Sequence, residues 1–237
     1  MTTLLIATGL YPPDIGGPAT YTKFLERHLP AHDIEYGVVA FTHVRKYPKL
    51  IRHILYLWRL LRAGRSVDII YALDTVSVGI PALIATRILG KKLFLRVPGD
   101  YAWEQGQQRF GITDTLDDYL KKKEKPFKVR VLAWLQSLVA RSASRVVVPS
   151  EYMKTVVSAW GVRPENVVRI YSALNPIVVE ENKEQLREKY EYSGFVCITA
   201  ARLTPWKGIE ALIDVASTLR ARGVDITLEI LGDGDRD

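Results

Sequence analysis

The residues of this sequence with the clearest chemistry are Arg202 and Lys207, five positions apart in the segment Ala200-Ala-Arg-Leu-Thr-Pro-Trp-Lys-Gly208. The segment follows a predicted strand and begins a predicted helix. A planar guanidinium and an ammonium group together suit a diphosphate, and a helix N-terminus adds backbone N–H donors. The alternative is two solvated surface cations. The Pro-Trp-Lys-Gly context makes this the most specific motif of the chain.

A second candidate site for phosphate follows the first predicted strand, in Leu10-Tyr-Pro-Pro-Asp-Ile-Gly-Gly-Pro-Ala-Thr20. Gly16 and Gly17 allow the backbone to approach a ligand, and Pro18 suits the first turn of a helix. The segment is neither a P-loop nor a G-x-G-x-x-G motif. Taken alone, it fits a purely structural turn equally well.

Two acidic residues, Asp100 and Glu104, come directly after the fourth predicted strand. Ligands of open α/β sheets bind at the carboxyl ends of strands, so both carboxylates would face that crevice as candidate catalytic groups. The alternative is that Asp100 caps a short helix and Trp103 is a packing residue. Ser150, at the end of the next strand, is predicted to cap the helix that follows it.

The stretch 45–65 holds seven Lys and Arg residues and no acid. It predicts a basic amphipathic helix whose apolar face comprises Leu50, Ile51, Ile54, Leu55, Trp58 and Leu61, with Leu57 and Leu60 widening it. Such a helix suits an anionic membrane, although an ordinary core-facing helix with a solvated basic face is the alternative. Lysines near 121 would lie near phosphate head groups or in water. The predicted membrane-contacting residues are Arg52, Trp58, Arg59, Arg62, Lys121, Lys122 and Lys123.

Histidine and cysteine give no metal site. His28 and His32 are four positions apart, but Pro30 lies between them and no acidic partner is near. The one cysteine, Cys197, excludes an internal disulfide and is predicted to be a small buried hydrophobe in the middle of a strand.

Short β-branched runs alternate with longer amphipathic runs, which predicts a doubly wound α/β fold with a parallel sheet buried on both faces. The predicted strands are 4–8, 36–42, 68–72, 92–97, 146–149, 167–171, 195–200 and 226–231. The predicted helices are 19–29, 48–63, 76–89, 128–142, 151–160, 183–190 and 206–222.

Charge divides the 237 residues into two parts. Residues 1–175 carry 25 Lys and Arg against 14 Asp and Glu, a net of +11, and residues 176–237 carry 8 against 12, a net of −4. The turn Asn175-Pro176 falls at the change of sign, so we predict domains 1–175 and 176–237. The positive charge of the first part favours an anionic partner, which could be nucleic acid, anionic lipid or a phosphorylated substrate.

Together, these motifs resemble the retaining GT-B glycosyltransferases of family 4. The resemblance runs from the first predicted strand to the last residue. It is carried by Tyr11-Pro-Pro with Gly16-Gly17, by Val148-Pro-Ser150, by Ala201-Arg-Leu-Thr-Pro-Trp-Lys-Gly208 and by Leu231-Gly-Asp-Gly234. It implies a GT-B fold, with a complete N-terminal Rossmann-like domain that binds the acceptor and the first βαβ portion of a second that binds a nucleotide-sugar.

The resemblance also implies roles for single residues. Arg202 and Lys207 would hold the donor diphosphate, and Gly16 and Gly17 would close over the donor from the other domain. Asp100 would act at the acceptor or the transferring sugar. The nucleotide-sugar is a substrate, and no cofactor or metal is expected. The acceptor would be a glycan or a lipid-linked molecule of cell-envelope, polysaccharide or lipopolysaccharide synthesis, used at the inner face of the membrane.

The sequence departs from the family pattern in two places. Ser172-Ala-Leu-Asn-Pro176 stands where the family has Asn-Gly-Val, and the family's later pair of glutamates is missing because the sequence stops at Asp237. We therefore expect a C-terminally truncated chain that does not transfer sugar efficiently alone. The alternatives are a non-catalytic membrane- or partner-binding module, or one half of a split enzyme.

Three expectations about location and partners complete the analysis. No uncharged stretch is long enough to span a bilayer and no signal peptide begins the chain, so we expect a cytoplasmic protein with peripheral contact to the inner membrane face. An unfinished second sheet would invite self-association or a partner chain. Specific nucleic-acid binding is not expected, because only the net charge of +7 favours it.

Overall fold

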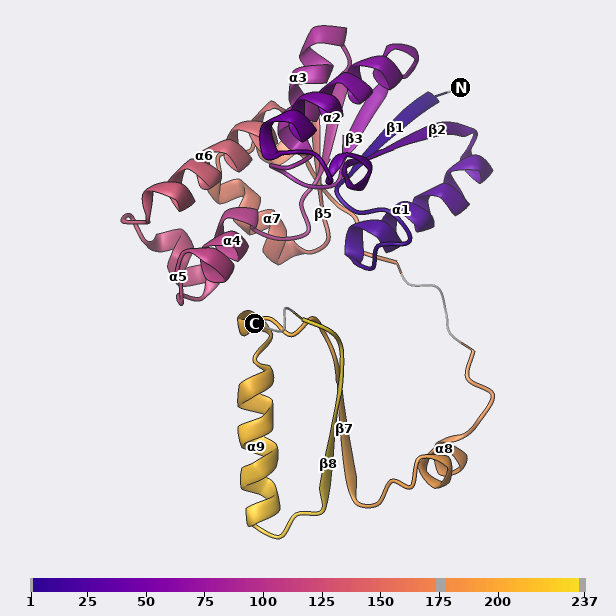
Figure 1. Cartoon of the computed structure of the whole chain (residues 1–237), viewed down its shortest axis with the longest axis vertical. Coiled ribbons are helices and arrows are strands. Elements are labelled where there is room, and N and C mark those ends of the chain that lie inside the picture. The colour runs from indigo at the N-terminus through magenta and orange to yellow at the C-terminus, as the bar shows by residue number, and fades with distance from the viewer. Residues whose placement is uncertain (1, 174–177, 235–237) are drawn as a thin grey trace. The chain divides into compact units, whose positions relative to one another are not determined.

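The computed structural model describes residues 2–173 and 178–234 of the chain, with the side chains of Lys49 and Leu50 excepted. Two compact units divide these residues (Figure 1). The first unit comprises residues 2–106 and 112–173, and the second comprises 107–111 and 178–234. Each unit is described by itself. The predicted turn at Asn175-Pro176 lies outside the described residues.

The first unit is built on a six-stranded parallel sheet with the order β2-β1-β3-β4-β5-β6. β1 therefore lies between β2 and β3, and the chain winds outward from it in both directions. The strands are β1 (Thr2–Thr8), β2 (Ile34–Ala40), β3 (Ile69–Ala72), β4 (Lys92–Arg96), β5 (Arg145–Val148) and β6 (Val167–Arg169).

Helices connect the strands and cover both faces of the sheet, as parallel pairing requires. The seven α-helices of this unit are α1 (Gly17–His28), α2 (Lys49–Ala63), α3 (Gly79–Leu89), α4 (Tyr101–Arg109), α5 (Leu116–Lys121), α6 (Phe127–Ser142) and α7 (Glu151–Ala159). Short 3-10 turns are η1 (Leu29–His32), η2 (Phe41–Val44), η3 (Gly64–Ser66) and η4 (Pro164–Asn166).

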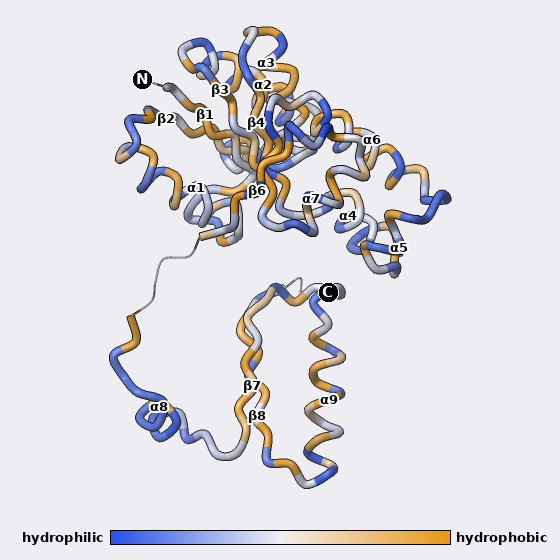
Figure 2. The backbone as a smooth tube through the Cα atoms, turned by 180° about the vertical axis from the view of Figure 1, so that it is seen from behind, coloured by the Kyte–Doolittle hydropathy of each residue, from blue (hydrophilic) through white to orange (hydrophobic). Residues whose placement is uncertain are grey.

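The core lies in two layers, one on each face of the sheet. Leu5, Ile70 and Leu95 point to a face where residues of α2, α3, α6 and α7 cover them. Ile6 and Tyr71 point to the other face, against α1. The central strands β1, β3, β4 and β5 are thus largely buried on both faces, as predicted, whereas the edge strands β2 and β6 are partly exposed. Hydrophobic residues follow the strands in Figure 2. Each fully buried large side chain contributes about 1.5–3 kcal/mol to folding.

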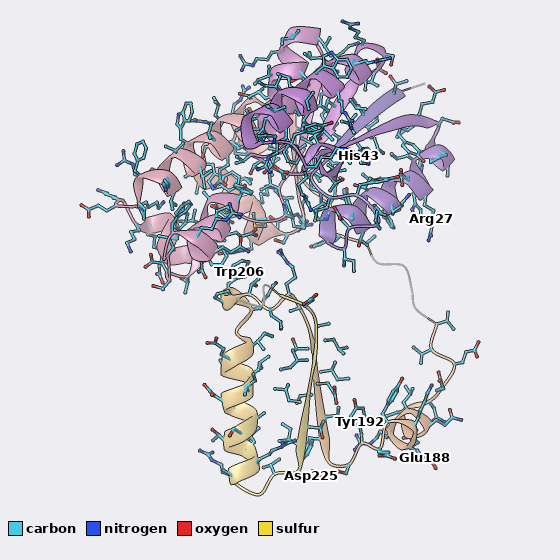
Figure 3. The ribbon with its side chains drawn as sticks, viewed as in Figure 1. Arg27, His43, Glu188, Tyr192, Trp206 and Asp225 are labelled. Atoms are coloured by element: carbon cyan, nitrogen blue, oxygen red, sulfur yellow. The ribbon has the colours of Figure 1, made fainter. Side chains whose placement is uncertain are left out.

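The second unit pairs β7 (Phe195–Ala200) with β8 (Ile226–Leu231) in parallel, with α9 (Ile209–Ala221) between them in the sequence. The turn η5 (Pro205–Lys207) precedes α9. A capping box formed by Asn182 and Gln185 begins α8 (Lys183–Lys189). Trp206 lies at one end of this unit and Asp225 at the other (Figure 3).

The prediction for Cys197 is wrong, because its side chain is exposed. β7 and β8 are covered by one neighbouring helix, α9, within the described residues (Figure 1). Phe195 and Ile198 are exposed for the same reason.

Every predicted strand and helix is present, with ends that differ by up to three residues. Sequence analysis did not predict α5 and allowed α4 only as the alternative role of Asp100. α4 is strongly polar and contains Gly106, so it lacks the apolar periodicity of the other helices. Ser150 caps α7 as predicted, accepting a hydrogen bond from the Met153 N–H at 3.1 Å.

The residue directly after β8, Gly232, must be glycine for a steric reason. A Cβ atom on this residue would overlap the carbonyl oxygen of Ala201, which is backbone and cannot rotate away. The chain beyond β8 is held beside the chain beyond β7 by a hydrogen bond from the Leu203 N–H to the Asp233 carbonyl, at 3.0 Å.

We predict that Gly232→Ala weakens the pairing of β7 and β8 by about 1–3 kcal/mol, the usual cost of overpacking. Amide hydrogen exchange of the two strands measures this as faster exchange. The matched control is Gly17→Ala, where a Cβ meets no atom within 4 Å. Equal protection of β7 and β8 in both variants would contradict the steric argument.

Candidate functional site at the carboxyl ends of the strands

The loops that follow β1, β3, β4 and β5 gather at one edge of the first unit, because all strands of its sheet run in the same direction. Strand order reverses at β1, so a crevice is expected between the loops after β1 and β3. Four of the predicted site residues, Gly16, Gly17, Asp100 and Glu104, belong to these loops or to the first turns of the helices they lead into.

The loop after β1 is shaped by Gly16. Its φ of 155° and ψ of 162° belong to a region that is almost exclusive to glycine, and a Cβ would lie 2.8 Å from Leu10 Cδ1. Pro18 occupies the first turn of α1, as predicted, and that turn carries no acidic side chain. The first-turn N–H groups have no partner within the helix. This helix start is therefore electrostatically suited to an anion.

Asp74 fixes the neighbouring loop after β3. Its Oδ1 accepts hydrogen bonds from the N–H groups of Val76 at 2.9 Å and Val78 at 3.0 Å. Burial raises the pKa of this carboxyl group, and the backbone hydrogen bonds oppose the rise. Gly9 brings β1 close to it, since a Cβ there would lie 3.3 Å from Asp74 Oδ2. Asp74 was not predicted as a site residue. An acidic residue close after a buried strand is the pattern that could have indicated it.

A buried arginine, Arg96, ends β4 and was also missed as a site residue. Its Nη2 donates a hydrogen bond to Ser172 Oγ at 2.8 Å, and its guanidinium carbon lies 3.6 Å from the centre of the Tyr21 ring. Its Nη1 is buried without a hydrogen-bond partner among the described residues. The Tyr21 and Tyr71 hydroxyls are 3.3 Å apart beside it. The signal was an arginine at the carboxyl end of a strand that is predicted to be buried.

Asp100 is the N-terminal cap of α4, which confirms the alternative stated for it. Its side chain is only 1% exposed. Oδ1 accepts hydrogen bonds from the Trp103 N–H and from Gln136 Nε2, both at 2.9 Å. Gln136 in turn accepts a hydrogen bond from the Ala102 N–H at 2.9 Å. Burial raises the pKa of Asp100, and these donors oppose the rise. A role of Asp100 in catalysis stays a prediction.

Glu104 lies one turn further along α4 and is half-buried. Its Oε1 lies beside Gly99, where a Cβ would stand 2.5 Å away. The acidic side chain also suits the positive end of the α4 dipole. Trp103, between the two acids, donates its indole N–H to the Asp114 carbonyl at 2.9 Å.

The predicted apolar face of α2 is divided in the structure: part of it packs against the core, and part of it is exposed. The helix buries Tyr56 and Leu60 completely, while Ile51, Ile54 and Trp58 of the predicted apolar face are exposed. The reason is that α2 is apolar on two sides, and the side that carries Tyr56 packs on the sheet. There the Tyr56 hydroxyl donates a hydrogen bond to the Val39 carbonyl at 3.0 Å. The side chain of Leu50 lies outside the described residues.

The predicted membrane-contacting cations differ in their surroundings. Arg52 is half-buried, with its guanidinium carbon 5.7 Å from the Phe41 ring centre. Arg62 is exposed beside Trp58, at 5.7 Å from its ring. Arg59, Arg62 and His43 line a cavity of about 390 Å³. His43 is labelled in Figure 3.

The three consecutive lysines at α5 are exposed: Lys121, Lys122 and Lys123. Lys122 pairs with Asp114, with its Nζ 2.9 Å from Oδ2. It is therefore partly neutralised.

In the second unit, Arg202 and Lys207 lie between the end of β7 and the start of α9, as predicted. Gly208 caps α9 with a φ of 66°, and its carbonyl accepts the Leu212 N–H at 3.1 Å. Both cationic side chains are exposed, and neither forms an ion pair with a residue of the described ranges 2–173 and 178–234. Two cations therefore stand at the positive end of a helix dipole.

The described residues lack two kinds of feature. They contain no group of three or more His, Cys, Asp or Glu side chains placed to hold a metal ion. Within the same residues, no helix has the length and apolarity needed to cross a membrane.

The Rossmann-like first unit is the N-terminal architecture of GT-B glycosyltransferases, and solved structures match the fold. Anabaena Alr3699/HepE in complex with UDP and glucose aligns with a TM-score of 0.63 at 20% identity, over 99% of this chain and 61% of that chain. The S. aureus MnaA–UDP structure aligns with a TM-score of 0.57 at 15% identity, over 98% and 62%. The chain thus spans about three fifths of the length of these structures.

Family membership follows from the sequence. Residues 6–173 match the glycosyl transferase 4-like domain, so the chain belongs to that family. No curated protein matches it.

The buried Asp100 yields a testable pH dependence. Because its folded-state pKa is raised above the ordinary 3.8, the native state binds its proton more tightly than the unfolded state does. Its contribution to stability is therefore lost as the pH rises above 3.8 through the folded-state pKa. We predict that the free energy of unfolding of wild type falls relative to Asp100→Asn over this rise, measured by urea denaturation. A constant difference between the two proteins would contradict it.

Proposed function

We propose that the chain takes part in glycosyl transfer from a nucleotide-sugar to a glycan or lipid-linked acceptor of cell-envelope or polysaccharide synthesis. Membership of the glycosyl transferase 4-like family supports the reaction class. The observation that carries the proposal is the pair of exposed cations, Arg202 and Lys207, at the N-terminal end of α9.

The chemistry of the donor explains why this pair matters. When the bond between the sugar and the diphosphate breaks, negative charge develops on the leaving nucleotide. A guanidinium, an ammonium and the N–H groups of a helix start are already in position before the reaction begins. They therefore stabilise the developing charge and lower the barrier without reorganising. The UDP complexes of the structural neighbours make UDP the first nucleotide to test.

The first unit would supply the acceptor side. In this proposal the α1 start at Gly16 and Gly17 faces the donor, while Asp100 and Glu104 orient the acceptor or the transferring sugar. We propose retention of anomeric configuration and independence from metal ions, both from the family resemblance. EDTA would then leave the affinity of the chain for UDP unchanged.

The test of donor binding is calorimetric titration of UDP into wild type, Arg202→Gln and Lys207→Gln. Loss of one charge-assisted contact, worth about 1.5–3 kcal/mol, should weaken binding roughly tenfold to a hundredfold. Arg222→Gln is the matched control, because Arg222 lies at the other end of α9. Equal affinities of all four proteins for UDP would contradict the proposal.

The exposed face of α2 favours a second proposal, peripheral binding to an anionic membrane. Ile54 and Trp58 are 67% and 55% exposed, although they are large and apolar. Arg59 and Arg62 belong to the same helix, and they line a cavity together with His43. An apolar row beside cationic side chains suits the boundary between acyl chains and negatively charged head groups.

Vesicle co-sedimentation tests the membrane proposal. We predict binding to phosphatidylcholine vesicles that contain phosphatidylglycerol, and weaker binding to pure phosphatidylcholine. Arg62→Gln should lower the affinity about fivefold, since one cation near the surface contributes about 1 kcal/mol. Ile54→Ser should lower it further, whereas Ile170→Ser, an exposed isoleucine after β6, serves as the control. Equal binding to both kinds of vesicle would refute the assignment.

A further inference from the structure

A cavity of about 330 Å³ lies among α4, α5, α6 and α7 in the first unit. Its size falls within the range of about 300–1,000 Å³ typical of small-molecule sites. Its lining residues all belong to the first unit and include neither Gly16 nor Gly17. The lining residues that matter here are Asp100, Tyr119, Lys125, Trp134, Gln136 and Trp160.

Three buried polar atoms of this lining have no hydrogen-bond partner among the described residues: Asp100 Oδ2, Tyr119 Oη and Trp160 Nε1. Asp100 and Tyr119 are each 1% exposed, and Trp160 is 8% exposed. The Trp160 indole N–H helps to lower the pKa of Asp100, but the pair forms no hydrogen bond of normal geometry. Leaving such groups unpaired costs about 1–3 kcal/mol each, so the lining is suited to a ligand that pairs with them.

The remaining bonds hold these groups in place. Gln136 and the start of α4 fix Asp100 through its Oδ1, which leaves Oδ2 as the open acceptor. Lys125 lies with its Nζ 4.0 Å from the centre of the Tyr119 ring. The lining is therefore built from fixed side chains with one acceptor and two donors that lack partners.

Charge selects the class of ligand. An anion would be repelled by the buried carboxylate of Asp100, and a cation by Lys125 and Arg141, which also lines the cavity. A hydroxyl group is neutral, donates to Asp100 Oδ2 and accepts from Tyr119 Oη or Trp160 Nε1. Aromatic side chains at Trp134, Trp160 and Tyr119 add apolar surface for the C–H groups of such a molecule.

We propose that this cavity binds a small neutral polyhydroxylated molecule of the saccharide class, with Asp100 Oδ2, Tyr119 Oη and Trp160 Nε1 as its hydrogen-bond partners. This inference rests on the proposed function in one respect, because Asp100 also acts on the acceptor side there, and it deepens that proposal by assigning the cavity to a saccharide. Saccharide binding in the cavity needs neither a nucleotide nor the second unit. Its failure and the failure of UDP binding are therefore separate results.

The test is NMR titration of the chain with glucose, N-acetylglucosamine and myo-inositol as separate probes. The indole N–H signal of Trp160, assigned with Trp160→Phe, should shift in a saturable manner with at least one probe. The indole signal of the exposed Trp58 on α2 should stay in place.

Two variants test the assigned atoms. Tyr119→Phe should weaken binding about threefold to tenfold, and Asp100→Asn, which keeps the capping oxygen, about tenfold or more. Tyr36→Phe on β2 is the control for loss of a tyrosine hydroxyl outside the cavity. Because the Tyr119 hydroxyl is unpaired, Tyr119→Phe should leave the thermal midpoint unchanged or higher, which separates a binding role from a structural one.

Each outcome decides the proposal. Saturable shifts at Trp160 that weaken in Tyr119→Phe and Asp100→Asn but not in Tyr36→Phe support it. Absence of shifts at Trp160 with all three probes overturns it, and the cavity would then hold only water. Shifts that are equal in wild type and Tyr119→Phe also overturn it.

Discussion

The parallel direction of all six strands is the constraint on which the first unit depends. Parallel pairing requires that a connection return the chain to the amino ends of the strands, and helices do so between all six strands. Every loop after a strand therefore falls at one edge. That edge brings together Gly16, Asp74 and the segment from Arg96 to Asp100, which come from three distant parts of the sequence. The second unit repeats the arrangement on a small scale and places Arg202 after β7.

Polar groups at this edge serve structure and chemistry at once. Asp74 and Asp100 both cap the turns that follow their strands, and both have raised pKa values because they are buried. A buried carboxylate with one satisfied oxygen is a fixed, directional acceptor. The same network that stabilises the start of α4 through Gln136 therefore prepares the cavity beside it.

Sequence patterns predicted the fold almost completely, because strand burial and helix amphipathicity are local and periodic. They placed Arg202 and Lys207 correctly, since a strand, a turn and a helix were all readable around them. They were only partly right for α2, where apolar residues on two sides left the inward face undetermined until Tyr56 packed on the sheet. They also missed Tyr119 and Trp160, because only tertiary packing brings α5 and α7 to Asp100.

Binding of a nucleotide diphosphate at the turn before α9 is tested most directly by backbone NMR of the chain during titration with UDP. We expect the largest amide shifts at Arg202, Lys207 and Gly208, with little change at Arg222 and Gly223. Largest shifts at residues away from the start of α9, or no shifts at saturating UDP, would contradict it.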